Sequence, residues 1–174
     1  MNFEQIFNID DISGNEWRGS LVATLQERAE IADRLDLLEV KSLSATIVVR
    51  PIMGRRGLSV DGSLQAEIVQ QCVVTLDPVE ESVATDFSSR FLPPELIEDL
   101  ESDEISYVGD EDPPEVLIDG ELAVGSIVVE YLSLAIDPYP RKPGVSVSDV
   151  IKPLEGVEEG AANRENPFHV LKKQ

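Results

Sequence analysis

Apolar and polar residues alternate along much of the first half of the chain. From Leu58 to Leu76, nearly every even position is apolar or small, whereas most odd positions carry polar or charged side chains. This period of two predicts an extended strand with one buried face. Because the run is far longer than an ordinary strand of about five or six residues, we expect a bend, a bulge or a crossing between sheets at Gly62 or Gln70.

The same alternation precedes and follows this run. Apolar residues of a single parity are Leu43, Ala45, Ile47 and Val49 upstream, and Val79, Val83, Phe87 and Phe91 downstream. Turn-forming sequences at 53–57 and 77–78 separate the three runs. Three strands joined in series by turns predict an antiparallel meander over about residues 42–92. Two shorter runs, over 3–9 and 17–23, predict strands before the meander.

Two segments have the apolar spacing of helices. A capping box that begins at Thr24 predicts a helix that ends near Leu37 and packs on the sheet. Gly125 and Ser126 are expected to cap a second helix over 127–136. That segment is apolar nearly all round, which predicts that the helix is largely buried.

These elements predict an α+β fold. It has an antiparallel β-sheet, open or barrel-like, with two main helices and an extended C-terminal tail. Residues 1–140 are expected to form a single domain, with a mobile acidic loop over 101–114. A short helix over 93–100 and a short strand over 116–118 flank that loop. The Pro-, Gly- and Glu-rich composition after residue 140 predicts that residues 141–174 form an extended or partly disordered tail. This tail is expected to end in a short Pro-Phe-x-x-Leu helical turn.

Negative charge is the strongest feature of the composition. The net charge is −20, and the window from Val79 to Glu121 holds fifteen acidic residues against one basic residue, Arg90. Such a surface repels phosphate backbones, so general nucleic-acid binding through charge is not expected. A basic protein is the natural complement. The alternative is that the acidity only keeps the protein soluble.

Residues that could carry catalysis are few. The single histidine, His169, lies in the tail, and the single cysteine, Cys72, lies on the inward parity of its strand, where a buried structural thiol is expected. The carboxylate pairs lack the spacing of a calcium loop. We therefore predict no catalytic residue, no cofactor and no metal site. The sequence shows neither a signal peptide nor a membrane-spanning run, so we expect a cytoplasmic protein.

Two features leave alternatives open. Arg50, Arg55 and Arg56 form the clearest basic cluster, which predicts either a solvated hairpin tip or a contact with RNA or an acidic partner. Glu130 lies within an otherwise apolar helix. A buried unpaired charge is costly, so Glu130 either faces outward or pairs with an arginine or with free backbone amides.

Three separated segments resemble the YceD family. The first is Gly62–Val79, with its Cys-Val-Val-Thr-Leu-Asp-Pro core, and the third is the terminal Asn166–Leu171. The most specific is Ile127–Gly144, whose Asp-Pro-Tyr-Pro-Arg-Lys-Pro-Gly run resembles the alphaproteobacterial branch. Many members carry two cysteine pairs, but here Thr75 occupies the second position of the first pair, and residues 141–150 hold no cysteine. Any metal or redox role of those pairs is therefore not expected in this chain.

The resemblance implies a bacterial factor for accumulation of the large-subunit ribosomal RNA and for ribosome assembly. The genes of family members often lie beside the gene for a small basic large-subunit ribosomal protein. The implied partner is therefore such a protein or a pre-ribosomal particle. We predict a non-enzymatic binding module. The residues expected to contact the partner are Glu98, Asp99, Glu101, Asp103, Glu130, Tyr139, Arg141 and Lys142. The alternatives are a metal-dependent nuclease acting on precursor ribosomal RNA and an acidic interaction protein unrelated to ribosomes.

Overall fold

Seven strands and three α-helices make up the described part of the chain. The computed structural model describes all residues except 1–2, 4–5, 9–11, 13–15, 103–112 and 146–174. The strands are β1 (Ile6–Asn8), β2 (Trp17–Val22), β3 (Glu39–Ile52), β4 (Gly57–Gln71), β5 (Pro78–Leu92), β6 (Glu115–Val116) and β7 (Glu121–Ala123). The helices are α1 (Leu25–Arg34), α2 (Pro94–Ser102) and α3 (Val124–Ala135), and a short 3-10 turn, η2 (Met53–Arg55), joins β3 to β4.

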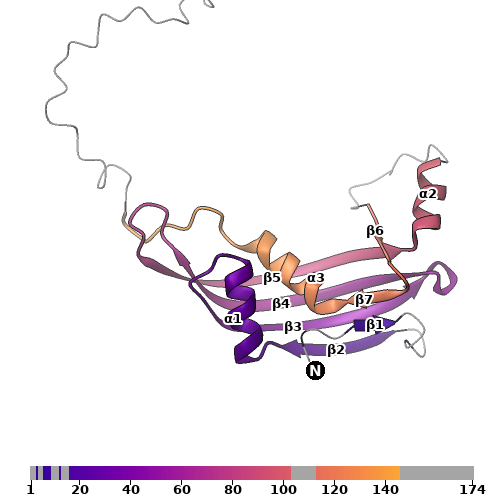
Figure 1. Ribbon diagram of the computed structural model, residues 1–174, viewed down its shortest axis with the longest axis horizontal. Coiled ribbons are helices and arrows are strands. Elements are labelled where there is room, and N and C mark those ends of the chain that lie inside the picture. The colour runs from indigo at the N-terminus through magenta and orange to yellow at the C-terminus, as the bar shows by residue number, and fades with distance from the viewer. Residues whose placement is uncertain (1–2, 4–5, 9–11, 13–15, 103–112, 146–174) are drawn as a thin grey trace, which may run out of the picture.

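One five-stranded sheet organises these elements, in the order β2-β3-β4-β5-β6 (Figure 1). The first four strands are antiparallel neighbours, and β6 joins the end of β5 in parallel. Strands β1 and β7 form a separate two-stranded antiparallel sheet. The predicted α+β fold and antiparallel meander are confirmed. The sheet is open and not barrel-like, because β2 and β6 lie at opposite edges and barrel closure requires the edge strands to pair.

The bulge or sheet crossing predicted for the long central strand is wrong. β4 pairs with β5 in a continuous register from Leu58 to Gln71, without a bulge or a crossing to a second sheet. The irregularity lies instead in β3, between Val40 and Ser42. Both neighbours of β4 are about as long as β4 itself, so the whole strand has partners. Gly62 allows the Phe87 ring to pack closely against the backbone of β4. A Cβ atom at this position would lie 2.4 Å from the ring and 2.8 Å from the Thr46 carbonyl oxygen.

Alternation along the strands gives the sheet one buried face and one open face. The predicted inward residues Leu43, Ala45, Ile47 and Val49 of β3 are all buried. Figure 1 shows α1, α3 and the β1–β7 pair lying over this buried face, and residues from all of these elements share one hydrophobic core. On the opposite face, the polar positions of β2 to β5 remain exposed or half-buried. One side of the sheet is thus uncovered in the described part of the chain.

Both main helices are confirmed, with shifted ends. The capping box of α1 is present: the Glu27 amide donates to Thr24 Oγ1 (3.3 Å), and the Thr24 amide donates to Glu27 Oε2 (2.7 Å). Helix α1 ends at Arg34, before the expected Leu37, because Asp36 has a φ of 54°, which a right-handed helix does not accommodate.

Helix α3 begins at Val124, with Ala123 and not Gly125 or Ser126 at its N-cap. The predicted cap is therefore wrong. Gly125 instead permits a close approach, since a Cβ atom there would lie 1.6 Å from the Phe3 carbonyl oxygen. Buried residues of α3 are Val124, Gly125, Ile127, Val128, Val129 and Leu132. The helix is therefore buried along one side, as expected, but Leu134 is 73% exposed, so the prediction that it is apolar and buried nearly all round is wrong.

Parts of the predicted loop and tail lie outside the described residues. In the expected acidic loop, residues 103–112 are not described, whereas residues 101 and 102 belong to α2. In the expected tail, residues 146–174 are not described, whereas residues 141–145 are. Among the helices that are described, none has the length and apolar character required to span a bilayer.

Candidate binding surfaces

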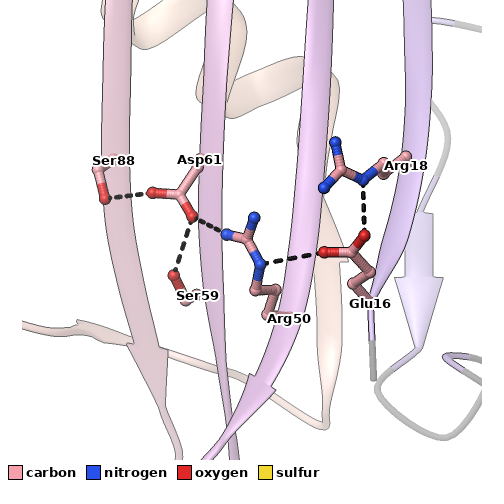
Figure 2. Close-up of polar contacts among 6 residues, drawn as sticks. All are labelled: Glu16, Arg18, Arg50, Ser59, Asp61 and Ser88. Carbon is pink, nitrogen blue, oxygen red and sulfur yellow. Dashed lines mark hydrogen bonds and ion pairs between the residues drawn. The ribbon is translucent and has the colours of Figure 1, made fainter. Parts of the chain in front are cut away.

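A network of charged side chains crosses the open face of the sheet (Figure 2). Arg50 on β3 connects two carboxylates: its Nη1 lies 2.5 Å from Asp61 Oδ2, and its Nε lies 3.2 Å from Glu16 Oε2. Asp61 also accepts a hydrogen bond from Ser88 Oγ (2.8 Å). The strand register creates this contact, because Asp61 pairs with Ser88 on β5.

Glu16 completes the network at the β2 edge. Its Oε1 lies 2.6 Å from Nε of Arg18. The hydrogen bond from Arg18 holds the pKa of the Glu16 carboxyl below its usual range, and the same bond raises the pKa of Arg18. Two arginines thus face two carboxylates, and Arg50 is occupied by carboxylates of its own chain. Of the predicted basic cluster, Arg56 is exposed and the Arg55 side chain lies outside the description.

A second polar cluster joins the β4–β5 turn to the segment that follows α3. The Val73 amide donates to the Pro140 carbonyl oxygen (3.0 Å), and Gln70 Nε2 donates to the Asp137 carbonyl oxygen (3.0 Å). Lys142 Nζ lies 3.1 Å from Asp77 Oδ2, and this interaction holds the pKa of the Asp77 carboxyl below its usual range. These contacts fix residues 137–142 against the turn.

Cys72 lies within this turn cluster and is fully buried, as predicted. Hydrogen bonds lower the pKa of its thiol to about 6, with the Thr75 hydroxyl as the largest cause and the Lys142 amide as the next. The Lys142 nitrogen lies 3.5 Å from Sγ. Burial alone would raise this pKa, but the donors outweigh it. Among the described residues, no group of three or more His, Cys, Asp or Glu residues could hold a metal ion.

The free energy of unfolding is expected to depend on pH through Cys72. The pKa of the thiol is about 6 in the folded state, below the value of 9.0 for an unperturbed cysteine thiol. The folded state therefore favours the thiolate. A depressed pKa adds stability above the unfolded pKa, and this stability is lost as the pH falls through the folded pKa. The stability advantage of the native chain over Cys72→Ala should therefore grow from about pH 6 to about pH 9. Urea denaturation across this range measures it.

The control for this experiment is Thr75→Val, which removes the largest cause of the low pKa. In that background, the stability difference caused by Cys72→Ala should change less with pH. A difference between the native chain and Cys72→Ala that stays constant across the range would contradict a stabilised thiolate.

Carboxylates gather where β5, β6 and α3 meet. Glu115 is exposed, but partial desolvation of its carboxyl raises its pKa. A hydrogen bond from Ser89 opposes that shift, and the Glu130 carboxylate raises the pKa further. The Tyr131 hydroxyl group lies 2.7 Å from Ser89 Oγ and donates to the Ser88 carbonyl oxygen (3.0 Å). Glu130 is exposed, so the outward alternative holds. Strand β6 and helix α3 thus place two acidic side chains beside the edge of β5.

The predicted partner-binding residues fall into separate places. Tyr139, Arg141 and Lys142 lie together in the turn cluster, where Tyr139 is 70% exposed. Glu98 is exposed on α2. The side chains of Asp99 and Glu101, and the whole of Asp103, lie outside the described residues. The structure does not join the turn cluster and Glu130 in one described set of contacts, so their shared role stays a prediction.

Several residues that form contacts in these candidate surfaces were not predicted from the sequence. Glu115 and Ser89 sit on different strands, and Asp77 meets Lys142 across 65 positions of the chain. Their residue types are ordinary for loops and strand faces, so no local signal identifies them. The acidity of the window from Val79 to Glu121 was the one signal that could have pointed to Glu115.

Comparison with known proteins gives one result. The family model described as "Large ribosomal RNA subunit accumulation protein YceD" matches residues 60–173, which is more than half of the chain. The matched region includes most of β4, all of β5 and α3, and the turn cluster around Cys72. No curated protein and no solved structure matches the chain.

Proposed function

Because the chain belongs to the YceD family, we propose that it supports accumulation of the large-subunit ribosomal RNA without being an enzyme. In this proposal, it binds a basic large-subunit ribosomal protein or a pre-ribosomal particle in the cytoplasm. The family description supports the link to the large ribosomal RNA. The mode of action, through a basic protein partner, is inferred from the charge of the chain.

The distribution of charge is the observation that carries this proposal. The chain has a net charge of −20, and two of its described arginines, Arg18 and Arg50, are already paired with carboxylates. The carboxylates of Glu95, Glu98, Glu115 and Glu130 lie on the exposed surface of α2, β6 and α3. A surface of this kind attracts a basic protein and repels bare phosphate backbones.

Reversal of the charges at and after α2 should weaken capture of the partner. We expect the variant Glu98→Lys, Asp99→Lys, Glu101→Lys and Asp103→Lys to recover about tenfold less large-subunit material than the native chain, which corresponds to about 1.4 kcal/mol. The loss arises because like charges would then meet at the contact. The measurement is capture by the tagged protein from gently lysed cells at low salt, with large-subunit proteins and precursor RNA quantified.

The matched control reverses as many acidic residues at the other end of the sheet. It is Glu30→Lys, Asp33→Lys, Asp36→Lys and Glu39→Lys, on and after α1, with the same change in net charge. This control should retain capture. Equal capture by both variants and the native chain would show that the acidity serves only solubility. Cleavage of precursor ribosomal RNA by the purified protein with Mg²⁺ or Mn²⁺ would contradict the non-enzymatic part of the proposal.

A further inference from the structure

One long edge of the five-stranded sheet is unpaired in the described part of the chain. β5 runs from Pro78 to Leu92, but β6 pairs only with Phe91 and Leu92. No described strand pairs with the outer edge of β5 from Val79 to Ser88. Figure 1 shows this edge along the side of the sheet away from β2. A long unpaired edge is a template for an additional strand.

Contacts at the far end of β5 reveal which backbone groups face this edge. The Leu117 amide donates to the Leu92 carbonyl oxygen (2.7 Å), and the Tyr131 hydroxyl donates to the Ser88 carbonyl oxygen (3.0 Å). Both carbonyls therefore point away from β4. The two backbone groups of a residue in an antiparallel strand share one side, and the side alternates along the strand. The β4–β5 register is continuous, so the even-numbered residues present their N–H and C=O groups outward.

Tyr131 occupies the Ser88 carbonyl, which leaves the stretch from Glu80 to Asp86 as the open part of the edge. The Asp86 carbonyl oxygen accepts a hydrogen bond from its neighbour, the Thr85 hydroxyl (3.2 Å). The outward groups of Ser82 and Ala84 lie in the middle of this stretch, and both residues are exposed. A strand paired with these groups would lie about 4.8 Å away in the plane of the sheet.

The charges along this edge define what can pair with it. Glu81 and Asp86 lie on β5 itself, whereas the Glu80 carboxylate is already paired with Lys41 Nζ (2.5 Å). The Glu130 carboxylate on α3 is exposed near Glu115. Two copies of this edge would place like charges opposite each other, which destabilises strand pairing. A second copy of the chain is therefore a poor occupant. An extended segment with lysines or arginines places opposite charges beside these carboxylates.

We propose that the edge of β5 accepts an extended basic segment of a protein partner as an additional β-strand. This inference rests on the proposed function, since it assigns a conformation and a docking site to the basic partner. Backbone hydrogen bonds to Ser82 and Ala84 supply the pairing, as in other cases of strand addition. Side chains of the added strand alternate between the open face, next to Asp86, and the helix-covered face, next to Glu81.

A synthetic peptide tests this proposal on the full chain. The probe is a peptide of about ten residues with alternating lysine and threonine, and the matched control carries the same sequence with alternate backbone amides N-methylated. N-methylation keeps the charge but removes the donors along one edge. We expect the control to bind about tenfold more weakly, as measured by titration calorimetry at low salt. We also expect the probe to slow hydrogen exchange of the Ser82 and Ala84 amides.

Substitution at Ala84 tests the protein side of the same edge. Ala84→Pro removes an outward N–H but no donor to β4, and Ala84→Val keeps the N–H and favours the strand. We expect the probe to bind Ala84→Pro about tenfold more weakly than Ala84→Val. Thermal unfolding of both variants establishes that each remains folded. If Ala84→Pro fails to fold, the comparison of the two peptides on the native chain decides whether backbone pairing contributes to binding.

Two outcomes would overturn strand addition. Equal binding of the methylated and unmethylated peptides shows attraction by charge alone, which leaves the proposed function intact. Absence of peptide binding, in a protein that still captures large-subunit material, excludes this edge as the site. Failure of the proposed function is a separate result, because it appears as the loss of large-subunit material from the native chain.

Discussion

Replacement of Phe87 by alanine is expected to lower the free energy of unfolding by about 3–5 kcal/mol. Phe87 is 6% exposed, and its ring stacks on Tyr131 of α3 with the centroids 4.9 Å apart. The ring also fills the space above Gly62, where a side chain would collide with it. Its removal leaves a cavity between β4, β5 and α3. Equilibrium denaturation in urea measures the loss.

Phe87→Leu is the control for this prediction. It keeps most of the apolar volume but removes the ring pair, which contributes about 0.5–1.5 kcal/mol. We therefore expect a clearly smaller loss than for Phe87→Ala. If the two variants unfold at the same denaturant concentration as the native chain, the contact between α3 and the sheet does not stabilise the fold as the structure indicates.

Two leucines of α3 should respond to the same substitution in different ways. Leu132→Ala is expected to lower the free energy of unfolding by about 2–5 kcal/mol, because the Leu132 side chain is 0% exposed and its loss creates a cavity. Leu134→Ala is expected to change it by no more than about 0.5 kcal/mol, because Leu134 is 73% exposed. Both changes have the same effect on helix propensity. The difference between the two variants in the free energy of unfolding therefore isolates the contribution of side-chain burial.

Thermal and urea unfolding of both leucine variants checks this prediction. Equal destabilisation would mean that α3 does not present its Leu132 side to the sheet. A large loss from Leu134→Ala alone would reverse the assigned orientation of the helix. Because the two residues are close in sequence, errors from denatured-state effects are expected to be similar in both variants.

Local sequence determined most of the secondary structure. The alternation around Leu43 to Val49 specifies which face of β3 is buried, because successive strand residues point to opposite faces. The capping box at Thr24 specifies where α1 begins, because it satisfies backbone amides within one turn. The short strand β7 was not predicted, since three residues carry no periodic signal and its partner β1 lies more than a hundred positions away.

Tertiary structure decided the candidate binding surfaces. The acidity of the chain and its family resemblance follow from sequence, because composition and local motifs do not depend on neighbours in space. Two features depend on which strands become neighbours: the pairing of Arg50 with Glu16, and the stretch of the β5 edge that no described strand covers. Strand order is set by packing of the whole core and by connections between distant segments. The sequence alone therefore suggested the type of partner that we propose, and only the folded chain placed the edge where we propose that it binds.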